Sequence, residues 1–227
     1  MRTDTLTKVW DLPTRLFHWS LVLLVVVAFW SGKQSEMSWH LWSGYGLLSL
    51  LLFRLGWGLW GSETSRFSHF VHGPGVVIDY LKGVLKKEPQ PHYGHNPAGA
   101  LMIVALLLVL LVQGVTGLFS SENTFLFFDG PLAPLVGGEI SESITFFHKK
   151  WGNLLLLLVP LHILANLLYL LILKENLFKP MLNGYTPADD RAGRYPYMLP
   201  TRRAIWTLLG AMALVALVMW GLPRLVG

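Results

Sequence analysis

The stretch TFFHKKWGNLLLLLVPLHILANLLYLLIL, residues 145–173, decides how the rest of the chain is interpreted. It is apolar enough to cross a lipid bilayer, yet it contains two histidines, His148 and His162, fourteen positions apart. An imidazole in hydrocarbon costs free energy unless a partner binds it, so an ionisable residue inside a membrane segment is a candidate for function. The first question is therefore what these two rings bind.

The composition is that of a membrane protein. Of the 227 residues, 53% are hydrophobic and 14% are charged, whereas soluble domains carry about 25% charged residues. The apolar residues form long blocks, which predict membrane spans. The chain has no cysteine, which excludes disulfides, thiolate metal sites, iron–sulfur ligation and covalent attachment of c-type haem. Any haem would therefore be held non-covalently.

Five blocks are long enough to cross the hydrocarbon core, which takes about 20 helical residues. Asp11 is expected to cap the first, with Pro13 in its first turn, where a missing N–H is tolerated. These blocks predict an all-α integral membrane protein. The predicted spans lie near residues 12–31, 39–60, 97–118, 146–173 and 204–222.

Positive charges predict the orientation of these spans. Lys and Arg are frequent before the first span, between the second and third, and between the fourth and fifth. Residues 119–145 contain neither and carry Glu122, Asp129, Glu139 and Glu142. Because positive loops stay cytoplasmic, we expect a cytoplasmic N-terminus and an acidic loop on the opposite side. The exceptions are Lys33, Lys149, Lys150 and Arg224.

Two further segments are not predicted to span the membrane. Residues 74–87 place apolar side chains on one helical face and lysines opposite, which predicts a helix lying at the membrane interface. That apolar face consists of Val77, Tyr80, Leu81, Val84 and Leu85. Residues 183–203 are polar and rich in Pro and Gly, which predicts a cytoplasmic loop.

The two histidines of the opening stretch project from nearly the same face of a helix. At about 1.5 Å per residue they are about 21 Å apart along the axis, one near each membrane surface. Each therefore needs a partner at its own depth. His18 lies on the cytoplasmic side of the first span and His40 at the far-side start of the second. Matching depths pairs His18 with His162 and His40 with His148.

Imidazoles paired at two depths across a helix bundle are what two haems require, because each iron takes two axial nitrogens. One buried histidine is more often a hydrogen-bonding group than a ligand, but four histidines in two matched pairs favour haem. Zinc or copper is disfavoured, since the pairs are far apart and lack further ligands. The predicted iron ligands are His18, His40, His148 and His162.

Other residues in and near the spans fit the same interpretation. Gly44 and Gly58 are also fourteen residues apart and would leave room for a porphyrin face, although glycines in membrane helices also serve ordinary packing. Arg54 follows His40 by fourteen residues, which puts it at the depth of the cytoplasmic pair, where a haem propionate would be its counter-ion. Arg15 is a second candidate for that role.

The connection between the second and third spans contains four more histidines. His69, His72 and His92 are interpreted as solvated loop residues. His95, in GHNPAG, is either the lining of a quinone pocket or an ordinary turn residue, since Asn96 is a natural N-cap for a helix starting at Pro97. His95, Tyr80 and Asp79 are candidates for proton uptake by a quinone.

Six motifs together resemble a known family. They are VWDLPTRLFHW (9–19), RLGWGLWG (54–61), RFSHFVHGP (66–74), GHNPAGALM (94–102), TGLF (116–119) and FHKKWGNLLLLLVPLHILANLLY (147–169). The chain resembles, over about residues 8–185, the di-haem cytochrome b subunits of the Ni/Fe-hydrogenase and bacterial cytochrome b561 group. The resemblance implies a four-helix transmembrane bundle holding two b-type haems through the same four histidines. Residues 1–185 would form this domain, and residues 186–227 a cytoplasmic loop and an accessory fifth span.

The expected function is electron transfer across a bacterial inner membrane, between a periplasmic redox protein and the quinone pool. The resemblance implies a hydrogenase iron–sulfur subunit or a c-type cytochrome as that partner. An acidic far-side loop suits a basic partner, whereas Lys149 and Lys150 would attract an anion. The alternative is therefore a stand-alone superoxide:quinone oxidoreductase. No nucleic-acid partner and no catalytic residue is predicted.

A haem-free transporter or assembly factor is the third class of function. It would require polar helix interiors or broken helices. Apart from Arg54 and Gln113, the spans show few polar residues of that kind.

Overall fold

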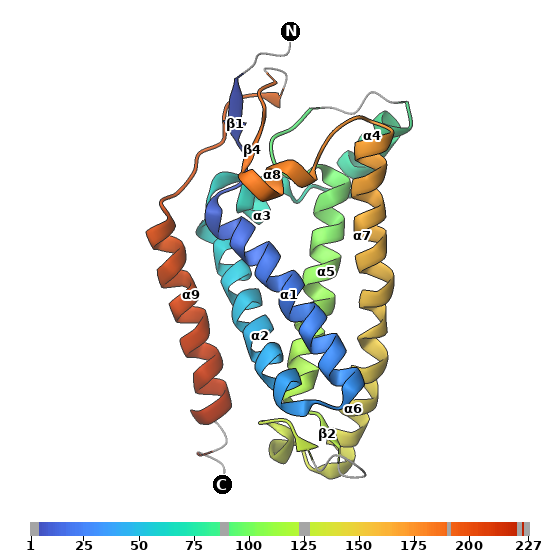
Figure 1. Ribbon diagram of the computed structural model, residues 1–227, viewed down its shortest axis with the longest axis vertical. Coiled ribbons are helices and arrows are strands. Elements are labelled where there is room, and N and C mark those ends of the chain that lie inside the picture. The colour runs from blue at the N-terminus through green and yellow to red at the C-terminus, as the bar shows by residue number, and fades with distance from the viewer. Residues whose placement is uncertain (1–4, 87–90, 123–127, 190–191, 222–223, 225–227) are drawn as a thin grey trace. The chain divides into compact units, whose positions relative to one another are not determined.

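The computed structural model describes residues 5–86, 91–122, 128–189, 192–221 and 224. Its long helices confirm the all-α class (Figure 1). They are α1 (Leu12–Gln34), α2 (Met37–Trp60), α5 (Pro97–Leu118), α6 (Gly138–Trp151), α7 (Asn153–Leu171) and α9 (Thr201–Ala216), which a π-helical turn continues over Leu217–Gly221.

Short elements connect the long helices. The short helices are α3 (Phe67–Phe70), α4 (Pro74–Leu85) and α8 (Phe178–Asn183), with 3-10 turns at Glu63–Ser65 and Ala133–Leu135. The strands are β1 (Leu6–Lys8), β2 (Ser121–Glu122), β3 (Phe128–Asp129) and β4 (Tyr185–Pro187). Of the predicted features, Lys87, Arg191, Leu222 and part of the acidic loop, 123–127, lie outside the described residues.

Within the described residues, four stretches are long and apolar enough to cross a membrane: Leu12–Gln34, Pro97–Leu118, Gly138–Leu171 and Thr201–Gly221. They coincide with four of the five predicted spans. Helix α2 has a sufficient length of 24 residues, and its only charged residue is Arg54. Its glycine, serine and aromatic content lowers its hydropathy, so its crossing of the membrane stays a prediction.

The helix boundaries differ from the predicted spans mainly at α6. This helix begins at Gly138, within a segment expected to be loop, because the polar sequence GEISES shows no apolar run. A left-handed Gly137, with φ of 78°, precedes it. Helix α6 ends at Trp151, and α7 resumes at Asn153 and includes Pro160.

The chain forms two compact units. Unit 1 comprises Met1–Leu16, Arg54–Ala105 and Leu158–Ile205, and unit 2 comprises Phe17–Phe53, Leu106–Leu157 and Trp206–Gly227. Helices α1, α2, α5, α7 and α9 each contribute residues to both units.

In unit 1 the segment after α7 is anchored rather than a free loop. Strand β4 pairs with β1 in antiparallel register, Leu6 opposite Pro187 and Lys8 opposite Tyr185, and α8 lies beside them (Figure 1). Beneath them Val9, Trp10 and Tyr93 form a buried cluster. The predicted loop over 183–203 therefore has regular structure at its start.

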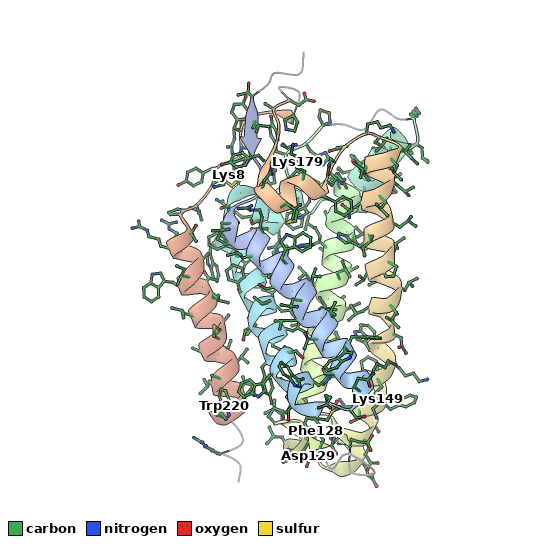
Figure 2. All side chains as sticks on the ribbon, in the orientation of Figure 1. Lys8, Phe128, Asp129, Lys149, Lys179 and Trp220 are labelled. Carbon is green, nitrogen blue, oxygen red and sulfur yellow. The ribbon has the colours of Figure 1, made fainter. Side chains whose placement is uncertain are left out.

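In unit 2 the end of α9, the fifth predicted span, packs into a hydrophobic core. Val215 of α9 and Met219 of the π-helical turn pack with α2 and α5 in a buried cluster that also contains Leu48, Leu118 and Leu132. Trp220, labelled in Figure 2, stacks near Trp42 with ring centroids 6.4 Å apart. Burial of such side chains is worth roughly 1.5–3 kcal/mol each in water.

Candidate haem site

His40 of α2 and His148 of α6 lie close together in unit 2. Their ring centroids are 6.1 Å apart and the ring planes are at 87°. Metal–imidazole bonds are about 2 Å long, so two rings on one metal, with roughly 1 Å from each nitrogen to its ring centre, would be about 6 Å apart. Perpendicular planes are compatible with this arrangement, because each ring rotates about its own bond. The spacing fits two axial imidazoles on one iron.

Hydrogen bonds fix the orientation of both rings. His40 Nδ1 donates to the carbonyl of Ala28 at 2.8 Å. The Thr116 hydroxyl donates to a carbonyl in its own helix, so it accepts from His148 Nδ1 at 3.1 Å. A proton on Nδ1 leaves the lone pair of Nε2 available for a metal. In the structure, Nε2 of His148 lies 2.9 Å from the amide nitrogen of Gln113.

Glycines of α1 and α5 lie against these two rings, and Gly44 of α2 borders open space. A Cβ at Gly44 would meet nothing within 4 Å, and the use of that space by a porphyrin stays a prediction. A Cβ at Gly32 would lie 3.0 Å from His40 Nδ1, and a Cβ at Gly117 would lie 3.1 Å from Cε1 of His148. These two glycines therefore let the helix backbones approach the imidazoles closely.

Arg54 lies in unit 1 and is 3% exposed. Its Nη1 donates to the carbonyl of Ser65 at 3.0 Å, and its guanidinium lies 4.8 Å from the ring centroid of Phe67. Asp11 is an electrostatic partner. Within the described part of the chain, Nη2 is buried without a hydrogen-bond partner. A buried cationic donor of this kind fits a carboxylate ligand such as a haem propionate.

Arg15 and Gly58 are also in unit 1, in different settings. Arg15 donates from Nη1 to the carbonyl of Leu182, and its Nε is buried with no partner among the described residues. Gly58 does not border open space: an added Cβ would overlap the ring of Phe67. The glycine at 58 is therefore explained by packing against Phe67 rather than by room for a porphyrin.

The other two predicted ligands belong to different units. His18 lies in unit 2 and His162 in unit 1, so their pairing stays a prediction. His162 Nε2 lies 3.5 Å from Nδ2 of Asn166, one turn later on α7.

The connection before α5 forms a cavity of about 580 Å³ in unit 1. His95 contributes to its wall and packs at a tilt against Trp10 and Phe70, with ring centroids 4.4 and 4.6 Å away. Burial, with help from the charge of Arg54, lowers the pKa of His95. His69, His72 and His92 also line this cavity, so the interpretation of them as ordinary solvated loop residues was incomplete.

Gln113 and Thr116 are the site residues that the sequence interpretation missed. They are three positions apart on α5 and both contact His148. The signal was present, because polar residues at i and i+3 in an otherwise apolar helix lie on one face.

The donor set fits haem better than a protein-only metal site. Among the described residues, no group of three or more His, Asp or Glu side chains is placed to hold a metal. Structural zinc needs four protein ligands, whereas a porphyrin supplies four of the six ligands of its iron. In unit 2, the two imidazoles of His40 and His148 are the kind of axial ligand pair that a b-type haem needs from a protein.

The comparisons with known proteins agree with this chemistry. The model of the family described as prokaryotic cytochrome b561 matches residues 9–184. No curated protein sequence and no solved structure matches the chain significantly. The match covers most of the chain and contains all four predicted histidines. The chain is therefore a multi-pass bacterial membrane protein of the prokaryotic cytochrome b561 family, whose members bind b-type haem and transfer electrons.

Proposed function

We propose that this cytochrome b carries electrons across the bacterial inner membrane between a periplasmic redox protein and the quinone pool. Two b-type haems would be held by His40 with His148 and by His18 with His162, with the N-terminus cytoplasmic. The observation that carries the proposal is the 6.1 Å spacing of His40 and His148, which suits one iron between two imidazoles.

Haem bound at these positions supplies reversible one-electron chemistry. The protein holds and tunes it. The hydrogen bonds from Nδ1 of His40 to Ala28 and of His148 to Thr116 fix the ring orientations and make the imidazoles more basic, which favours the oxidised iron. The amide of Gln113 has to turn away from Nε2 of His148, because that contact and a metal bond use the same lone pair.

The far-side surface favours a protein partner over a small anion. Lys149 pairs with Glu122 at 2.8 Å, so one of the two lysine charges beside His148 is already neutralised. Lys150 lies against the ring of Phe146. Figure 2 shows Lys149 at the same end of unit 2 as Phe128 and Asp129, which belong to the acidic loop. The local attraction for superoxide is therefore weak, and the stand-alone superoxide:quinone oxidoreductase is the less favoured function.

Haem counting in the purified protein tests the ligand assignment. Wild type should show b-type absorption bands with two haems per chain. His40→Ala and His148→Ala should each lose one haem, and His18→Ala and His162→Ala the other. His72→Ala, which changes an exposed histidine, is the matched control and should keep both. Wild-type haem content in His148→Ala and His162→Ala would exclude these ligands.

Electron donors then separate the two functions. Under the proposal, a quinol or a reduced periplasmic protein reduces the haems, and a superoxide pulse without a partner protein does not. Rapid reduction by superoxide alone would replace the proposal with the superoxide:quinone function.

A further inference from the structure

Two tyrosine hydroxyls meet in the interior of unit 1. Tyr80 of α4 and Tyr169 of α7 are joined by a hydrogen bond of 2.9 Å between their hydroxyl oxygens. Tyr80 is 6% exposed although most of α4 is exposed. Burial raises the pKa of Tyr80, so this pair stays neutral at physiological pH.

On one side the pair reaches the cavity of unit 1. Tyr80 lines this cavity and its ring contacts that of His92 edge-on, with centroids 5.9 Å apart. The cavity wall is rich in groups that exchange protons with water. They are Glu63, His69, His72, Asp79, His92 and His95, with Arg194 as the charged neighbour.

On the other side the pair reaches the face of α7 that carries His162. Asn166 and Tyr169 follow His162 at i+4 and i+7, so the three residues share one helical face. Asn166 donates to the carbonyl of His162 at 2.7 Å. Tyr169 is therefore about 10 Å along the helix axis from His162.

The remaining neighbours hold the hydroxyls in place. Asn96 caps α5 with its side-chain oxygen, which accepts from the N–H of Gly99 at 2.6 Å, so its amide N–H is left to bond with the Tyr169 hydroxyl. Glu175 interacts electrostatically with both tyrosines. The groups facing the pair are thus Asn96, His92 and Glu175.

We propose that Tyr80 and Tyr169 form a proton path from the cavity to the α7 face that carries His162, and so deliver protons to a quinone reacting there. The inference rests on the proposed function. Reduction of one quinone to quinol consumes two electrons, which arrive through the cytochrome, and two protons, which come from water in the cavity.

Each proton moves by exchange along the hydroxyls. Tyr80 accepts a proton from the cavity side as its own proton passes to Tyr169, and Tyr169 releases its proton towards the quinone. Both tyrosines end neutral, so no buried phenolate forms. Phenylalanine in either position keeps the packing and removes the path.

A purely structural explanation makes a different prediction. The hydrogen bond would then only fasten α4 to α7, and its loss would lower the unfolding temperature without changing the chemistry. Such a clamp would affect neither the pH profile of quinone reduction nor its solvent isotope effect.

The test compares Tyr80→Phe and Tyr169→Phe with Tyr185→Phe, an exposed tyrosine of β4. Quinone reduction by the haem-loaded protein is measured against pH in H₂O and D₂O, together with haem content, midpoint potentials and thermal stability. Tyr80→Phe and Tyr169→Phe, the inner variants, should reduce quinone about tenfold or more slowly than wild type. Their pH profile and solvent isotope effect should change, while their haem content and midpoint potentials match wild type. Tyr185→Phe should match wild type throughout.

A second readout does not depend on turnover. The reduced-minus-oxidised infrared spectrum of wild type should contain a tyrosine C–O band that each inner variant lacks. If Tyr80→Phe does not fold, Tyr169→Phe decides the question. If a folded inner variant keeps the wild-type pH profile and isotope effect, the proton path is wrong, while the proposed electron-transfer function still stands. Failure of wild type to exchange electrons with quinone overturns both this path and the proposed function.

Discussion

The indole Nε1 of Trp57 donates a 3.0 Å hydrogen bond to Oδ2 of Asp11, and both residues are almost fully buried in unit 1. The other carboxylate oxygen, Oδ1, accepts from the backbone N–H of Thr14 at 2.8 Å. One carboxylate therefore caps α1 and ties it to α2. Asp11 is also the negative charge that interacts with buried Arg54.

Removing this carboxylate should destabilise the protein. Asp11→Ala removes the cap of α1 and the carboxylate oxygen that accepts from the Trp57 N–H, which together cost about 2–4 kcal/mol. Asp11→Asn keeps one acceptor and should lose about half as much. Thermal unfolding in detergent measures both. Asp79→Ala, which breaks only the exposed pair with Lys82, is the control. Equal stability of Asp11→Ala and wild type would contradict the structure.

The open space beside Gly44 should be essential for haem binding. Gly44→Val fills that space and should remove one of the two proposed haems from the absorption spectrum. Gly210→Val is the matched control, because Gly210 is also a helical glycine of unit 2 with nothing within 4 Å of an added Cβ. It should keep both haems. If Gly44→Val retains wild-type spectra, the space beside Gly44 does not belong to a haem site.

Gly58 should behave as a packing residue. Gly58→Ala forces the ring of Phe67 aside and should lower stability by about 1–3 kcal/mol. Phe67→Ala removes the obstacle, so Gly58→Ala should cost less in that background. The double-mutant cycle should therefore show a coupling of at least about 0.5 kcal/mol. Strict additivity of the two substitutions would mean that Phe67 is not the constraint on residue 58.

The contact between Glu63 and Arg194 should make stability depend on pH. Arg194 Nη2 lies 2.7 Å from Glu63 Oε1, and the backbone N–H of Tyr197 donates to Oε2. Burial alone would raise the pKa of Glu63, but these partners outweigh it and lower that pKa. The Glu63 carboxylate therefore stabilises the fold at pH values above the ordinary glutamate pKa of about 4.3. This stabilisation is lost as the pH falls through the lower pKa of Glu63 in the folded protein.

Glu63→Gln measures this contribution. Wild type should unfold at a higher temperature than Glu63→Gln at neutral pH, and the difference should shrink on acidification below about pH 4. The exposed pair of Asp79 and Lys82 provides the control, and Asp79→Asn should change little at either pH. A difference that grows on acidification would have the wrong sign.

Much of the helical structure could be predicted because its signals are local. Apolar length places α1, α5, α7 and α9, and the N-caps at Asp11 and Asn96 are confirmed by bonds to Thr14 and Gly99. The helix predicted over 74–87 is found as α4 at Pro74–Leu85, and its place at the membrane interface stays a prediction. The pairing of His40 with His148 was proposed from depth alone, and the structure brings these two rings together in unit 2.

The rest depends on contacts between distant residues. Nothing near Gly58 in the sequence reveals that Phe67 fills its space. The polar segment 183–203 resembles a free loop, yet Glu63 fixes it through Arg194 and Tyr197. The start of α6 was missed because its first turns are polar. These turns are held by contacts with other parts of unit 2, such as the hydrogen bond from the Ser141 hydroxyl to the carbonyl of Phe119.

The pairing of β1 with β4 has a consequence for biosynthesis. Leu6–Lys8 precede all four predicted ligand histidines in the chain, and their partners, Tyr185–Pro187, follow all four. Domains usually fold as they emerge, N-terminal parts first. Here β1 must wait for β4, so this small sheet can close only after the four predicted ligand histidines have been synthesised.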